Sequence, residues 1–110
     1  MKSIINGKRF DTNSPRTTLV LDNLGPCGLG NRDFSHWRAG LYRTQGGSWF
    51  LAGHGGPMTQ FSYSVGNATS GGERIIPLTA DEARAYLENE GERGVEAIER
   101  YTEAFGVIDA

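Results

Sequence analysis

Glycine-rich turns restrict the fold of this chain more than any other feature of its sequence. Sixteen of its 110 residues are glycine, whereas the usual share is roughly 7%. Glycine adopts positive φ angles without strain, so this density favours tight turns, bulges and loops over long helices. We therefore expect a sheet of short strands to form most of the molecule.

Turn residues mark where the strands of that sheet begin and end. Asn6-Gly7 suits a type I′ hairpin turn, because both central positions of this turn need positive φ. Gln45-Gly46-Gly47 divides the strongest predicted hairpin. The segments with strand character are residues 4–5, 8–10, 17–21, 36–44, 48–53 and 74–77. Together they predict an antiparallel sheet of about four to five strands.

A helix is predicted directly after the last strand. Thr79 and Glu82 have the spacing of a capping box, in which each side chain accepts the backbone N–H of the other residue. Gly91 is a suitable end for this helix. Its apolar stripe consists of Ala83, Tyr86 and Leu87.

A second helix, over about residues 94–105, completes the predicted fold. Its apolar residues Val95, Ile98 and Phe105 recur at near-helical spacing, and Gly106 follows them. The commonest domain size is about 100–150 residues, so one domain is expected. We predict a single α+β domain over residues 1–110, with the two C-terminal helices packed on one face of the sheet.

Residues 55–72 are expected to form a long loop. This stretch begins and ends with glycine and has no strong periodicity. Loops of such length are uncommon in compact domains and are often functional. We therefore count this segment among the candidate contact regions.

Acidic residues gather in the last third of the chain. Residues 1–72 carry seven lysines and arginines against three aspartates, whereas residues 73–110 carry four arginines against ten acidic residues. A row of carboxylates along a helix can engage a basic surface. A solvated face that promotes solubility is the simpler interpretation. The candidate partner-binding carboxylates are Glu92, Glu96, Glu99 and Glu103.

The central hairpin supplies a second candidate surface, which is basic and aromatic. Arg38, Tyr42 and Arg43 have the composition of a sheet that stacks single-stranded bases and holds phosphates. The neighbouring tryptophans and Phe50 are more simply explained as core residues, because a small domain needs large side chains there. His36 and His54 bracket the hairpin near its open ends, where they could form a metal pair or a pH-sensitive contact with each other. A polar residue at each strand end is the simpler interpretation, and His54 is also counted among the candidate partner-binding residues.

The sequence indicates no catalytic, metal or cofactor site. Cys27 is the only cysteine, so a zinc site built from it with His36 and His54 would need carboxylates as well. The chain contains neither a Gly-x-Ser-x-Gly elbow nor a complete phosphate-binding loop. We therefore expect a non-enzymatic protein that uses no metal and no cofactor.

The location and the oligomeric state are inferred from what the sequence lacks. The first residues do not form the apolar run of a signal peptide, and no apolar stretch approaches the roughly 20 residues of a membrane span. We expect a cytoplasmic protein without membrane contact. A homodimer stays open, because a strand edge or either helix could pair two copies.

Two sequence blocks resemble a family of small uncharacterised proteins from prophages and integrative elements. The first block is Leu41-Tyr42-Arg43-Thr44 followed by residues 47–57, and the second is residues 71–79 followed by Glu82-Ala83. The blocks cover roughly a third of the chain. The resemblance implies an accessory protein of a mobile element that acts in a bacterial cytoplasm. Proteins in that setting often block host defence, as anti-CRISPR and antirestriction proteins do.

Two hypotheses for function follow from these features. The leading one is an anti-CRISPR-like protein that binds and inhibits a host defence complex, itself a nucleic-acid-binding effector, through the acidic helices and residues 55–72. The alternative is a single-stranded nucleic-acid-binding domain that uses the basic and aromatic face of the sheet.

Overall fold

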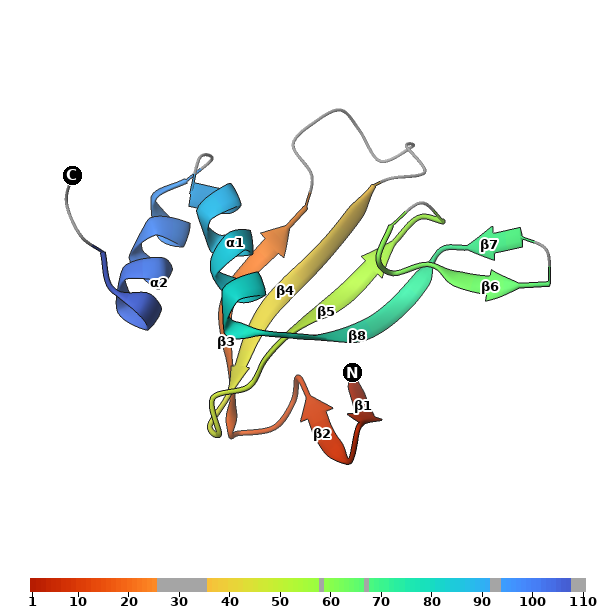
Figure 1. Ribbon diagram of the computed structural model, residues 1–110, viewed down its shortest axis with the longest axis horizontal. Coiled ribbons are helices and arrows are strands. Elements are labelled where there is room, and N and C mark those ends of the chain that lie inside the picture. The colour runs from red at the N-terminus through yellow and green to blue at the C-terminus, as the bar shows by residue number, and fades with distance from the viewer. Residues whose placement is uncertain (26–35, 58, 67, 92–93, 108–110) are drawn as a thin grey trace.

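An antiparallel sheet and two helices make up the structure, a computed structural model that describes residues 1–25, 36–57, 59–66, 68–91 and 94–107. Within these residues all strands precede both helices, in the order that the sequence predicts (Figure 1). The elements are β1 (Lys2–Ile5), β2 (Lys8–Asp11), β3 (Thr17–Leu24), β4 (Trp37–Thr44), β5 (Trp49–Gly55), β6 (Tyr63–Val65), β7 (Ala68–Ser70), β8 (Gly72–Leu78), α1 (Ala80–Gly91) and α2 (Val95–Phe105).

The central sheet has four antiparallel strands in the order β3-β4-β5-β8. The turn between β4 and β5 ends at Gly47, whose φ of 89° lies in the left-handed region that favours glycine. In the register of this hairpin, Leu41 pairs with Leu51 and Tyr42 pairs with Phe50. The sequence-based expectation of an antiparallel sheet with about four to five strands is confirmed.

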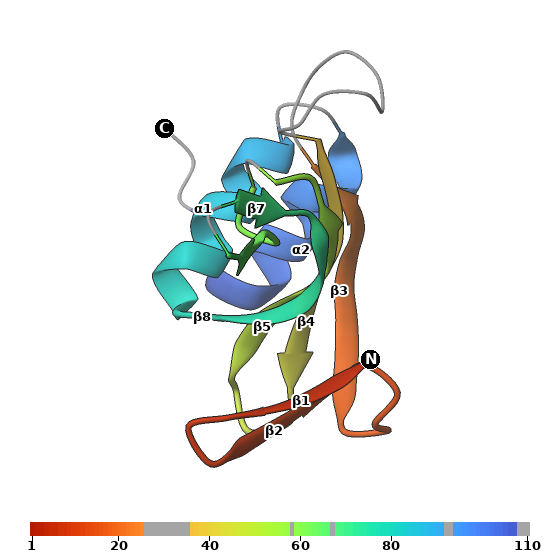
Figure 2. The same cartoon turned by 90° about the vertical axis from the view of Figure 1, so that its right-hand side faces the viewer.

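Both helices pack on one face of this sheet (Figure 2). Alternate residues of the strands point toward the helices, as the period of two in a strand requires. The sheet contributes the fully buried Leu41 and Leu51, and α1 contributes the fully buried Leu87. The main core consists of Leu21, Leu24, Ala39, Leu41, Trp49, Leu51, Phe61, Ala83, Leu87 and Ala97. The predicted α+β class, with two C-terminal helices on one face, is confirmed.

The ends of the helices follow the sequence signals closely. The Thr79 backbone N–H donates to Glu82 Oε1 at 2.9 Å, and the Glu82 N–H donates to Thr79 Oγ1 at 3.1 Å. This reciprocal capping box begins α1. Helix α2 ends where Gly106, with φ 76°, donates its N–H to the Thr102 carbonyl at 3.0 Å.

The opening hairpin covers part of the opposite face of the sheet. Asn6 and Gly7, with φ 52° and 77°, form the turn between β1 and β2. The Phe10 ring then packs edge-on against Phe50, with ring centroids 5.3 Å apart. Ala52 and Ile75 complete this smaller core. Phe50 is thus buried in this smaller core, whereas Trp49 is buried in the main core on the helix side. Both are core residues, as the simpler interpretation of the aromatic residues predicts.

Strand β3 is longer than the predicted segment 17–21. It continues to Leu24 because its register against β4 shifts twice, once between Leu19 and Leu21 and once between Leu21 and Leu24. Asn23 adopts a φ of 59° within the second irregularity, a conformation that asparagine tolerates better than most residues. The bulges add residues to β3 while they keep Leu21 and Leu24 in the core.

The prediction that residues 55–72 form a loop without strands is wrong in part. Strands β6 and β7 form a two-stranded hairpin within this stretch, at the end of the long axis opposite the helices (Figure 1). Phe61 is fully buried in the main core beside Trp37, with ring centroids 6.0 Å apart. The Thr59 hydroxyl donates to the Gly56 carbonyl at 2.8 Å and accepts the Phe61 backbone N–H at 3.2 Å, so it stabilises the turn that precedes Phe61. The segment therefore has a structural anchor that its lack of periodicity concealed.

Candidate functional site

Helix α2 exposes apolar side chains on its outer surface. Val95 is 70% exposed and Ile98 is 52% exposed. The residues of α2 that pack toward the sheet and α1 are instead Ala97, Tyr101, Ala104 and Phe105. The sequence pattern aligns Val95 and Ile98 with Phe105, but only Phe105 of these packs inward, where its ring stacks on Trp49 with centroids 5.4 Å apart. Branched apolar side chains are thus left in solvent on a helix that is otherwise acidic.

A shallow groove runs between the outer surfaces of α1 and α2. Its volume is about 360 Å³, and it is lined by Leu87, Glu88, Gly91, Ile98, Tyr101 and Val107. Val107 is itself 56% exposed. The Tyr101 hydroxyl donates to Glu88 Oε1 at 2.8 Å and bridges the two helices. The pKa of Tyr101 is raised by this hydrogen bond to Glu88, so the hydroxyl keeps its proton and stays a donor.

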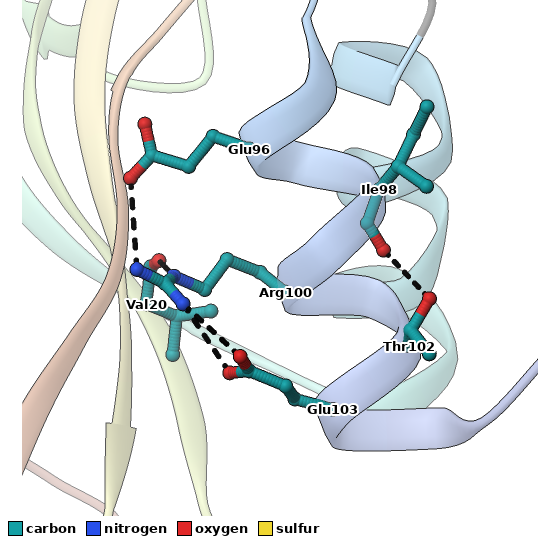
Figure 3. Close-up of polar contacts among 6 residues, drawn as sticks. All are labelled: Val20, Glu96, Ile98, Arg100, Thr102 and Glu103. Atoms are coloured by element: carbon teal, nitrogen blue, oxygen red, sulfur yellow. Dashed lines mark hydrogen bonds and ion pairs between the residues drawn. The ribbon is translucent and has the colours of Figure 1, made fainter.

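The acidic row on α2 is partly neutralised by one arginine (Figure 3). The Arg100 guanidinium lies 3.8 Å from Glu96 Oε1 and 3.3 Å from Glu103 Oε1. Its Nε donates to the carbonyl of Val20 on β3 at 3.1 Å. Arg100 therefore pins α2 to the sheet, and two of the four predicted partner-binding carboxylates help to hold it there.

Among the described residues, Glu99 is the predicted carboxylate that is not paired with a basic side chain. It is exposed, and within the described ranges it takes part in no ion pair or hydrogen bond. Glu92, the fourth predicted carboxylate, lies outside the described residues. The described parts of α1 and α2 together carry seven carboxylates and two arginines, so the helical layer remains strongly acidic.

Arg38 and His54 lie opposite one another on β4 and β5, and His54 also pairs with Glu73 on β8. These residues lie beyond the part of the sheet that the opening hairpin covers. Arg38 does not extend freely into solvent, because its Nη1 donates to the Trp37 carbonyl at 3.1 Å. A Cβ atom on Gly25 would lie against this guanidinium and 2.6 Å from the Trp37 carbonyl oxygen, so a larger residue there would force the backbone to shift.

Tyr42 lies on the same side of the sheet as Arg38 but within the small aromatic core. Its ring stacks on Phe50 with centroids 5.1 Å apart and an interplanar angle of 10°. Burial raises the pKa of Tyr42, and the carboxylate of Asp22 raises it further. The face of Tyr42 that a nucleic-acid base would use is therefore partly occupied.

Arg43 points to the helix side of the sheet, where its guanidinium lies over the Trp49 ring, 5.1 Å from the centroid. Arg38 and Tyr42 belong to the opposite side, as expected from the alternation of side chains along a strand. The three residues of the predicted nucleic-acid-binding face thus do not share one surface. What the sequence did not indicate is that Arg43 lies near Arg16 and Arg100, which come from distant parts of the chain.

The sequence analysis also considered a metal site that would include Cys27. Cys27 lies outside the described residues, and no group of three or more His, Cys, Asp or Glu side chains could hold a metal ion within the part that is described. Neither α1 nor α2 has the length and apolar character that crossing a bilayer requires.

The sheet and its helical layer define the class of this molecule as an α+β protein with two helices on one face of a four-stranded antiparallel sheet. Comparison with known protein families, curated proteins and solved structures finds no match for the chain. Function is therefore inferred from the surface chemistry of the described residues.

Proposed function

We propose that this protein is a non-enzymatic binding protein whose helical layer docks on a basic protein surface. The observation that carries the proposal is the exposure of Val95 and Ile98 among carboxylates. A face that served solubility alone would be polar throughout. Exposed apolar side chains surrounded by charge are typical of interfaces, where a dry centre is enclosed by a polar rim.

The groove between α1 and α2 would accept an apolar side chain of the partner. Ile98 and Val107 provide exposed apolar walls above the buried Leu87, and Glu88 lies at the same groove. An aliphatic or aromatic side chain with a neighbouring lysine or arginine would complement both features. Glu99 would then add long-range attraction, which raises the rate of encounter more than the final affinity.

The partner that we propose is a host defence complex that binds nucleic acid, which the protein would inhibit in the manner of an anti-CRISPR protein. Such complexes expose basic channels for their nucleic acids, and an acidic surface with an apolar centre is complementary to a channel of this kind. The mobile-element setting comes from the resemblance of residues 41–44, 47–57 and 71–79 to proteins of prophages and integrative elements.

The proposal is tested by affinity capture with matched variants. Tagged wild-type protein is incubated with lysate from a bacterium that carries a CRISPR–Cas system, and retained proteins are identified by mass spectrometry. Ile98→Glu is expected to weaken capture roughly tenfold or more, as for the loss of an apolar anchor. Glu99→Lys should weaken capture less, and should make it less sensitive to salt.

The controls place the same chemical changes elsewhere. Ile4→Glu introduces a carboxylate at an apolar side chain that is 74% exposed on β1, and Glu73→Lys reverses a charge on β8. Both variants are expected to capture the partner as the wild type does. Equal capture by Ile98→Glu and Ile4→Glu would exclude the helical layer as the docking surface, and a captured partner unrelated to defence would exclude the proposed class of partner.

A further inference from the structure

A second concave surface lies on the other side of α2, where this helix meets the ends of β3 and β4. The hollow has a volume of about 650 Å³. Its polar lining consists of Arg16, Thr18, Arg43, Thr44, Gln45, Arg100 and one carboxylate, Glu103, which is paired with Arg100. They come from three segments of the chain: the pairing of Thr17 with Thr44 places Arg16 beside residues 43–45, and the hydrogen bond from Arg100 to the Val20 carbonyl brings α2 to the same place.

Two of these arginines are available to bind an anion. Arg16 and Arg43 are exposed, and neither forms an ion pair within the described ranges. The Trp49 ring beneath Arg43 holds its guanidinium in place without neutralising it. Arg100 differs, because Glu96, Glu103 and the Val20 carbonyl already occupy its donors.

The basic surface continues beyond this hollow. A neighbouring hollow of about 500 Å³ shares Arg16, Thr44 and Gln45 with the first and adds Arg9 and Asp11 from β2, with the Asp11 carboxylate accepting the Asn13 backbone N–H. The two hollows are neighbours because they share these residues, and together they reach from α2 to the opening hairpin. We name this pair of hollows, which contains Arg9, Arg16 and Arg43, the arginine channel. Cations spaced along a channel match a chain of phosphates better than a single phosphate, which needs one compact cluster.

We infer that the arginine channel binds the phosphate backbone of a single-stranded nucleic acid. The three guanidinium groups contact successive phosphates, and Thr44 and Gln45 provide neutral hydrogen-bonding groups between them. Trp49 and Phe50 are buried and offer no platform for bases. Binding therefore depends on phosphates, with weak sequence preference and steep salt dependence. This inference does not depend on the proposed docking of the helical layer.

The test is a fluorescence anisotropy titration with a labelled single-stranded twelve-nucleotide oligo(dT) at several salt concentrations. Wild-type protein is expected to bind at low salt, with affinity that falls as salt rises. Arg16→Ala is the primary variant, since its side chain makes no hydrogen bond or ion pair within the described ranges. Arg16→Ala and Arg43→Ala should each weaken binding several-fold and reduce the slope of log K against log salt by about 0.7.

Arg38→Ala is the control, because Arg38 lies at the start of β4, whereas Arg43 and Thr44 of the arginine channel lie at its other end. It is expected to leave oligonucleotide binding unchanged. Weaker binding by Arg38→Ala together with unchanged binding by Arg16→Ala would overturn the inference, and so would no binding at low salt. Thymidine monophosphate should compete poorly, and a duplex of the same length should bind less tightly. Equal binding of either ligand would overturn the assignment to a single strand.

Discussion

Arg100 illustrates how one side chain can organise several parts of this protein. Its guanidinium reaches the Val20 carbonyl on β3 and the two carboxylates of Glu96 and Glu103 on its own helix. The ion pairs are largely exposed, so they contribute little to stability. The hydrogen bond to Val20 matters more, because the acceptor is partly buried and the donor is charged.

Replacement of Arg100 by methionine should therefore destabilise the protein by about 1–2 kcal/mol. Methionine keeps much of the apolar stem but leaves the Val20 carbonyl without its charged donor. The free energy of unfolding is measured by urea denaturation. Arg9→Met, at an exposed arginine of β2, is the control and should change it by less than about 0.5 kcal/mol. An equal effect of the two substitutions would show that the contact between α2 and β3 is not stabilising.

At the scale of single residues, the sequence predicted local signals better than tertiary ones. The reciprocal bonds of Thr79 and Glu82 follow from their spacing of three residues and are confirmed. The exposure of Val95 and Ile98 was missed, because apolar residues at helical spacing ordinarily face a core. Ala97 and Ala104 were the residues that marked the inward face of α2, since both pack against the main core and small residues allow a helix to approach its neighbours closely.

Among the elements, the hairpin of β6 and β7 is the least integrated. Within the part of the chain that the structure describes, its strands pair only with each other, and two strands alone are marginally stable in water. The preceding Phe61 is instead fully buried in the main core. The stretch 55–72 thus combines a fully buried residue, Phe61, which we call the anchor, with a largely exposed hairpin over residues 63–70, which we call the arm. Glycine content and length could not reveal this division.

We expect the anchor and the arm to respond differently to substitution. Phe61→Ala should cost about 3–5 kcal/mol of unfolding free energy, because it leaves a cavity beside Trp37. Replacement of residues 63–70 by a short turn should cost less than about 1 kcal/mol. Urea denaturation measures both, and Phe61→Leu provides a milder change if Phe61→Ala does not fold. A shortened hairpin that destabilises as much as Phe61→Ala would contradict this division.

The helices and the strands other than β6 and β7 were predictable because turn or cap signals mark them. Asn6-Gly7, the Gln45–Gly47 turn and Gly106 all lie where the structure reverses direction or ends a helix. The arginine channel was not predictable, because Arg9, Arg16 and Arg43 come from three strands or turns whose order in space depends on sheet topology. Opposite faces explain why Arg38 and Arg43, both on β4, do not act together.

On the scale of the whole molecule, the structure is flat, with extents of 48 × 36 × 20 Å. The helical layer covers one face of the sheet, while the opening hairpin covers only part of the other. Local stability should therefore be unevenly distributed, and the backbone amides of the two central strands, β4 and β5, should be the best protected against hydrogen exchange.

Hydrogen exchange measured by mass spectrometry should follow this distribution. Peptides from β4 and β5 are expected to exchange most slowly, because both strands have hydrogen-bonded neighbours on two sides and buried side chains. Peptides from β1 and β2, and from β6 and β7, should exchange at least tenfold faster, since each pair forms an isolated two-stranded sheet. Uniform protection across all strands would contradict this picture.

The bulge at Val20 has a consequence for how copies of this protein behave when crowded together. A straight outer strand is a template on which another chain can add its own backbone, the first step toward aggregates. Strand β3 lies at the rim of the sheet, but its two irregularities interrupt that template and Arg100 occupies one of its carbonyls. Pro77 removes a donor from β8 at the other rim. Both margins of the sheet are thus poorly suited to recruit further strands, which favours a protein that stays dispersed at high concentration.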